Sequence, residues 1–152
     1  MRRVRARTAA EILRDWNNRS YLSGGGADIL NLFELVAYLV VRSKTLDRED
    51  AWVNFSEWAL KWWMVYLPAI EVQRADDFTI FEDYDALIQS FRDYAESRDL
   101  SEENINPTDA QLRSFLAGEV ELVERLRYRR PLGFPPTWLG ERLLTRWREE
   151  QP

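Results

Sequence analysis

Apolar residues recur every three or four positions along the chain, which is the spacing that places them on one face of an α-helix. This period predicts an all-α fold, and we expect a single-domain bundle of five or six helices. The predicted helices begin near Thr8 and Pro107 and cover residues 28–43, 47–74, 79–97 and 136–148. Helices 28–43 and 47–74 carry the widest apolar faces, so we expect them at the centre of the bundle.

Residues that suit helix ends support these boundaries. Side chains able to accept hydrogen bonds from the free amides of a first helical turn occur at four predicted starts. They are Thr8 with Glu11, Asp28, Asp47, and Thr79 with Glu82. Pro68 removes one backbone donor inside helix 47–74, so we expect a kink near residues 65–67.

The length of 152 residues predicts one helical domain, residues 1–152. Residues 1–7 are rich in arginine, and we expect them to form a disordered basic tail. Residues 19–27 contain three consecutive glycines, which predict a flexible loop because glycine adds backbone freedom.

The chain contains neither cysteine nor histidine. Disulfides, thiolate metal sites, cysteine nucleophiles and Ser-His-Asp triads are therefore excluded. No glycine-rich phosphate-binding motif is present either, because the three glycines lack the Lys-Ser/Thr that a P-loop requires. We expect no cofactor and a function that is not enzymatic.

A narrow polar stripe runs along the otherwise apolar helix 28–43. Asn31, Glu34, Tyr38 and Arg42 fall within about 80° on a helical wheel. The stripe is either a thin solvent-facing side or a buried polar network, in which a carboxylate would require a cation. Arg74 falls on the apolar side of helix 47–74, and a guanidinium suits a carboxylate. The candidate internal network is therefore Asn31, Glu34, Tyr38 and Arg74, with an ion pair between Glu34 and Arg74.

Helix 47–74 carries an unusual number of large aromatic residues. A tryptophan stripe at helical spacing is typical of a core, but it also suits a partner-binding groove or a membrane-interface face. The wide apolar arcs of both central helices make a homodimer seam a further option. The candidate interface residues are Trp52, Trp58, Trp62, Trp63 and Tyr66.

Two pairs of acidic residues one helical turn apart could bind Mg²⁺ through carboxylates alone. The pairs are Glu82 with Asp85 and Glu121 with Glu124. They support an alternative function as a carboxylate-dependent Mg²⁺ nucleotide phosphohydrolase. The simpler interpretation is that acids at a helix start favour the helix dipole, and that acids beside arginines form a solvated face.

The net charge of −5 argues against binding to duplex nucleic acid. Arg2, Arg3, Arg5 and Arg7 could contact an anionic membrane surface, as a peripheral membrane adaptor would. The longest apolar stretch covers residues 29–41, which is short for a spanning helix, so we expect no transmembrane segment. We expect a cytoplasmic protein, peripheral to the membrane if that surface is used.

The run from Ile29 to Tyr38, followed by Ile70, Arg74, Phe81 and Tyr84, resembles a family of uncharacterised bacterial all-helical domains. The resemblance covers residues 29–91. Members often carry an N-terminal transmembrane helix, which we do not expect here, and the family implies no activity. Our hypothesis is a helical protein-interaction or assembly module that binds itself or another protein.

Overall fold

The computed structural model describes residues 1–18, 24–100 and 105–128, with the backbone alone described for residues 123–128. This part of the chain is helical and contains no strand, which confirms the predicted all-α bundle. Its elements are α1 (Arg2–Arg14), the 3₁₀ turn η1 (Trp16–Asn18), α2 (Gly24–Ala37), the π-helical segment η2 (Tyr38–Arg42), α3 (Arg48–Arg74), α4 (Glu82–Ser97) and α6 (Asp109–Tyr128). The predicted helix 136–148 lies outside the described residues.

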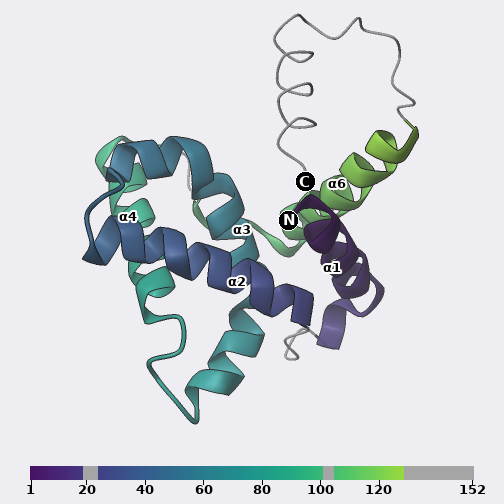
Figure 1. The fold of residues 1–152 in the computed structure, drawn as a ribbon, viewed down its shortest axis with the longest axis horizontal. Coiled ribbons are helices and arrows are strands. Elements are labelled where there is room, and N and C mark those ends of the chain that lie inside the picture. The colour runs from purple at the N-terminus through teal and green to yellow at the C-terminus, as the bar shows by residue number, and fades with distance from the viewer. Residues whose placement is uncertain (19–23, 101–104, 129–152) are drawn as a thin grey trace, which may run out of the picture.

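The helices pack as two neighbouring groups. α1 and α6 lie side by side at one end, and α2, α3 and α4 pack together at the other (Figure 1). Large side chains that are almost fully buried come mainly from the second group. They include Ile29, Leu30, Phe33, Leu60, Trp62, Tyr66, Ile70, Tyr84, Leu87, Ile88 and Phe91. This core confirms that α2 and α3 are central helices.

The start of α3 follows its sequence signal. Asp47 is the N-cap, and its Oδ1 accepts a hydrogen bond of 2.7 Å from the Glu49 amide. The helix runs to Arg74 without a break at Pro68. α2 instead continues into the π turns of η2, where the Ser43 amide donates to the Tyr38 carbonyl at 2.9 Å.

The predicted tail at residues 1–7 and the predicted start at Thr8 are both wrong. α1 begins at Arg2, and Thr8 is buried in the middle of the helix. The helix extends to the N-terminus because it packs along α6, where Arg5 is buried as well. The capping pattern at Thr8 and Glu11 depends only on local spacing, so it could not predict this long-range contact.

Three glycines that we assigned to a flexible loop form the first turn of α2. A Cβ atom at Gly26 would overlap the Tyr66 ring, and one at Gly25 would overlap the Thr8 hydroxyl. Glycine at these two positions lets α2 approach α3 and α1 closely. Asp28 therefore lies one turn inside the helix and is not its cap, while residues 19–23 lie outside the described residues.

The capping box predicted at the start of α4 is absent, and a capping box occurs instead at the start of α6. Thr79 bonds to Asp77, so the predicted capping box with Glu82 does not form, and α4 begins after Phe81 in a left-handed conformation with a φ of 55°. α6 does begin with a capping box. Thr108 accepts from the Gln111 amide at 3.3 Å, and the Gln111 side chain accepts from the Thr108 amide at 2.7 Å.

Candidate functional site

Glu34 of α2 caps the first turn of α4. Its Oε2 accepts a hydrogen bond of 2.8 Å from the Tyr84 amide, and its Oε1 lies 3.4 Å from the Asp83 amide. These amides have no partner within their own helix, so a carboxylate from a neighbouring helix takes the place of a local cap. The carboxylate also lies at the positive end of the helix dipole. Glu34 thereby joins α2 to α4.

Arg74 of α3 holds the turn that leads into the same helix. Its Nε donates to the Ile80 carbonyl at 2.8 Å and its Nη2 to the Phe81 carbonyl at 3.0 Å. Its Nη1 lies 2.7 Å from Asp85 Oδ2. The predicted ion pair between Glu34 and Arg74 is therefore wrong. Both residues serve the start of α4, but Arg74 takes its carboxylate from α4 itself.

Burial raises the pKa of Glu34 above its usual value. The two α4 amides and the Arg74 guanidinium lower that pKa, but they do not offset the loss of hydration. A partly desolvated carboxylate held by backbone amides has its acceptor sites occupied. This arrangement explains a structural role for Glu34 and leaves it poorly placed for proton transfer to a ligand.

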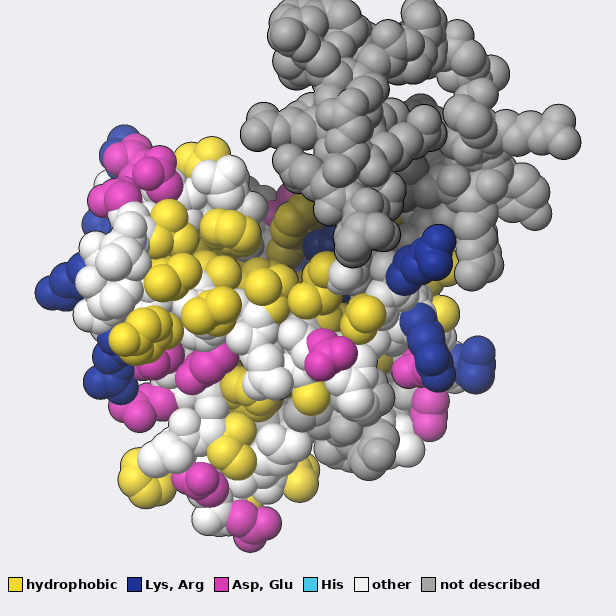
Figure 2. Space-filling model, in the orientation of Figure 1, with side chains coloured by type: hydrophobic (Ala, Val, Ile, Leu, Met, Phe, Trp, Pro, Cys, Tyr) yellow, Lys and Arg dark blue, Asp and Glu magenta, His cyan; other side chains and the backbone are white. Residues whose placement is uncertain are grey.

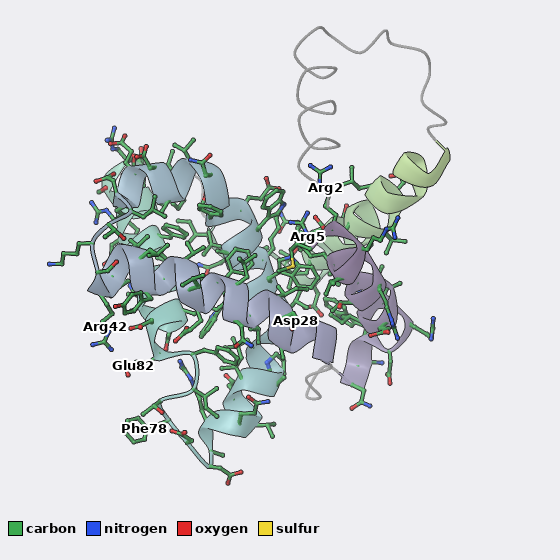
Figure 3. All side chains as sticks on the ribbon, viewed as in Figure 1. Arg2, Arg5, Asp28, Arg42, Phe78 and Glu82 are labelled. Atoms are coloured by element: carbon green, nitrogen blue, oxygen red, sulfur yellow. The ribbon has the colours of Figure 1, made fainter. Side chains whose placement is uncertain are left out.

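The rest of the predicted polar network is also wrong, because Asn31 and Tyr38 are exposed. Asn31 and Tyr38 form a thin solvent-facing side of α2, which is the first of the two interpretations of the stripe, while Glu34 is partly buried against α4. Arg42 ends the stripe, and it binds Asp83 at 2.6 Å and Glu82 at 3.1 Å. Arg42 and Glu82 lie together where η2 meets the start of α4 (Figure 3).

Most of the candidate aromatic interface belongs to the core. Trp62, Trp63 and Tyr66 are no more than 2% exposed, which excludes them from a surface. Trp52 is partly buried with its ring edge-on to Phe91, at a centroid distance of 5.6 Å. Trp58 alone of the five is exposed. The tryptophan stripe is explained by packing against α4 and α6.

A buried ion pair between α1 and α6 was not predicted. Arg5 Nε lies 3.1 Å from Glu119 Oε2, and the two side chains are 9% and 7% exposed. The Arg5 guanidinium also lies 4.4 Å from the centroid of the Trp58 ring. Burial raises the pKa of Glu119, and Arg5 lowers it by a smaller amount. A signal existed in the sequence, because Glu119 stands one heptad after Leu112 within an apolar stripe.

A groove of about 420 Å³ opens between α3 and α6. Trp58, Phe115 and Gly118 line it together with charged residues of both helices. Its charges already have partners within the chain. Lys61 binds Glu57 at 2.6 Å and lies 5.3 Å from the Phe115 ring centroid. The ion pair of Lys61 thus lies within α3, and Lys61 contacts α6 through the Phe115 ring.

The candidate metal ligands whose side chains the structure describes do not form a cluster. Among the described residues, no group of three or more potential ligands lies close enough to hold a metal ion. Glu82 is paired with Arg42 and Asp85 with Arg74, so arginines neutralise both carboxylates. Glu121 lies near the end of the described side chains, and the Glu124 side chain lies outside them.

An exposed apolar surface runs along the outward side of α2 and η2. Leu35 is 56% exposed and Tyr38 is 49% exposed, and they lie between the half-buried Leu32 and Leu39. Figure 2 shows hydrophobic side chains gathered in a band along this helix. Asp28 and Arg42 lie toward its opposite ends (Figure 3). We call the surface formed by Leu32, Leu35, Tyr38 and Leu39 the α2 face.

The helix that carries the α2 face meets the length and hydropathy expected of a membrane span. Gly24–Arg42 has 19 residues, its most apolar window has a mean hydropathy of 1.4, and 33% of that window is buried in the fold. The core helix of a soluble protein passes the same test. The expected apolar stretch, residues 29–41, was shorter because the helix was predicted to begin at Asp28 and in fact begins at Gly24.

Comparison with protein-family models, with curated proteins and with solved structures found no match to this chain.

Proposed function

We propose that this chain is a non-enzymatic assembly module that self-associates through the α2 face. The observation that carries the proposal is the exposure of Leu35 and Tyr38 on a helix whose other sides build the core. A scattered exposed leucine is ordinary, but a row of apolar side chains along one helix indicates a binding surface. Tyrosine is also enriched at such surfaces, because it offers a large apolar ring and a polar tip.

The chemistry around the face favours a protein partner over a lipid surface. Helices that lie on membranes are usually flanked by Lys and Arg that meet anionic headgroups. Here Asp28 and Asn31 border the face, and Arg42 is engaged by two carboxylates. Of the four N-terminal arginines offered for a membrane contact, Arg5 is buried against Glu119. A protein surface of mixed charge fits these borders better.

The acidic residues of α4 give less support to a Mg²⁺-dependent hydrolase. The carboxylates that could have bound Mg²⁺ on α4 are held by Arg42 and Arg74, and they fix helix contacts. Within the described residues, the buried charged side chains Arg5 and Glu119 also face each other. The carboxylates that a hydrolase would use to bind metal are therefore paired with arginines, and these pairs hold α1, η2, α3, α4 and α6 together.

The substitution Leu35→Lys tests the proposal. Burying a charge at the centre of the α2 face should raise the dissociation constant of self-association by roughly 100-fold. Val53→Lys is the matched control, because Val53 is 74% exposed on α3 and lies outside the face. Sedimentation velocity of the two variants and the unmodified chain measures the difference.

Two results would contradict the proposal. An equal effect of both substitutions would place the contact elsewhere on the molecule. A monomer that binds anionic lipid vesicles, and loses that binding in Leu35→Lys, would assign the face to a membrane.

A further inference from the structure

The groove between α3 and α6 continues into an apolar strip along α6. Trp58 of α3 is 39% exposed at the groove, and Phe115 and Gly118 line it from α6. Leu122 stands one turn beyond Gly118 on the same side of α6 and is 41% exposed. We call the surface formed by Trp58, Phe115, Gly118 and Leu122 the α6 strip. It leads along α6 toward Tyr128, where the described chain ends.

α1 does not reach the end of α6. The two helices run antiparallel, because Arg5 pairs with Glu119 and the Trp16 indole donates to Asp109 at 3.2 Å. Met1 therefore lies about one turn beyond Glu119 along α6. The last turns of α6 extend past α1 and away from α3 (Figure 1). The end of the α6 strip thus requires a cover that the described residues do not supply.

We infer that residues 136–148 dock on the α6 strip as a helix that runs antiparallel to α6. Their sequence predicts a helix that places Leu139, Leu143 and Trp147 within about 80° on a helical wheel. An apolar face of this kind is stable only when it packs against another element. The α6 strip is an exposed apolar surface of the same chain. It is separate from the α2 face, so the inference does not depend on self-association.

The length of the chain after α6 fits this arrangement. Residues 129–135 form the connection, and seven residues fall within the range of roughly 2–8 that joins neighbouring helices. Pro131 and Gly133 favour a turn there. A helix over residues 136–148 is about 20 Å long, which matches the distance along α6 from Tyr128 back to Phe115. The segment can therefore cover the strip from the end of α6 to the groove.

The charges that border the two surfaces are of opposite sign. Glu57 lines the groove on the side of α3, where it binds Lys61 through Oε1 and remains 73% exposed. Helical spacing places the exposed Glu121 on the opposite border of the strip. Arginines flank the apolar face of the segment on both sides, with Arg146 on one side and Arg148 on the other. Acidic borders thus meet basic ones, which favours the contact and orients it.

Single cysteines test the docking, because the chain has none of its own. A Cβ atom at Gly118 meets nothing within 4 Å among the described residues, so the thiol of Gly118→Cys is accessible unless residues 136–148 cover it. Val72→Cys is the reference, because Val72 is 57% exposed and lies far along α3 from Trp58. In the full chain we expect maleimide to label Gly118→Cys at least about 10-fold more slowly than Val72→Cys, with each rate normalised to that of the variant unfolded in urea. Leu122→Cys should be slow as well, and it tests the strip without adding volume.

Substitutions in the segment identify the cover. In the Gly118→Cys background, Leu143→Lys should restore the labelling rate to that of Val72→Cys, because it places a charge on the apolar face. Thr145→Lys is the matched control, since Thr145 lies on the opposite side of the predicted helix. It should leave the labelling slow.

The other outcomes would overturn the inference. Labelling of Gly118→Cys and Leu122→Cys as fast as that of Val72→Cys would show that the strip is open. Slow labelling that Leu143→Lys leaves unchanged, or that Thr145→Lys abolishes to the same extent, would assign the protection to another contact. Slow labelling at about 50 µM that disappears at about 1 µM would assign the strip to a second copy of the chain.

Discussion

At the scale of single residues, helix α4 depends on two side chains that come from other helices. Glu34 accepts hydrogen bonds from its first amides, and Arg74 binds the carbonyls of the preceding turn. The sequence predicted an internal structural role for both residues, because a carboxylate and a guanidinium each stood beside an apolar face. It could not predict that each binds the backbone, because every backbone position offers the same groups.

The raised pKa of Glu34 makes a prediction about pH. A carboxyl whose pKa is higher in the folded than in the unfolded chain adds stability below its unfolded pKa, and this is lost as pH rises through the folded value. Glutamine does not titrate. The free energy of unfolding of Glu34→Gln should therefore improve relative to the unmodified chain as the pH rises above the ordinary glutamate pKa of 4.5. Urea unfolding at a series of pH values measures the difference, and a constant difference would contradict the cause assigned to the pKa.

Removal of the Arg74 guanidinium should destabilise the fold. Arg74→Met leaves two carbonyls and Asp85 without a donor, and we expect a loss of about 2–4 kcal/mol in the free energy of unfolding. Arg7→Met is the control, because Arg7 forms an exposed pair with Glu11 and should change stability by less than about 0.5 kcal/mol. Equal effects in chemical denaturation would show that the contacts of Arg74 contribute little.

At the scale of helices, two glycines with opposite surroundings test the packing of α2. Gly26→Ala brings a methyl group into the Tyr66 ring and should cost about 2 kcal/mol or more. Gly118→Ala has open space around it within α6 and should stabilise by about 0.5–1 kcal/mol. Thermal unfolding of both variants measures the two signs. A stabilising effect of Gly26→Ala would contradict close packing of α2 on α3.

Helices were predicted well where the signal is local, and poorly where a distant contact decides. The start of α3 at Asp47 and the core face of α4 follow from a cap and from helical spacing. The extension of α1 to Arg2 could not be predicted, since it accompanies burial of Arg5 against Glu119, more than one hundred residues away. Consecutive glycines likewise predict freedom, unless a neighbouring helix requires the absence of a side chain.

At the scale of the whole molecule, most of the aromatic residues considered as an interface are buried, and an exposed apolar surface lies on α2 and η2 instead. The tryptophans of α3 are consistent with a core or with an interface, and packing against α4 and α6 places Trp62 and Trp63 inside. On the α2 face the opposite holds, because Leu35 of α2 and Tyr38 of η2 lie in a largely apolar segment and yet face outward. Helical spacing identifies apolar residues, but only the arrangement of helices decides which of them remain exposed.

The mass of the unmodified chain across a dilution series tests self-association most directly. Sedimentation equilibrium from about 100 µM to about 0.1 µM covers the range of dissociation constants in which a modest interface is occupied and then released. We expect twice the chain mass of 18.1 kDa at the highest concentration, with any decrease appearing only on dilution. A mass of 18.1 kDa at every concentration would contradict the proposed assembly through the α2 face.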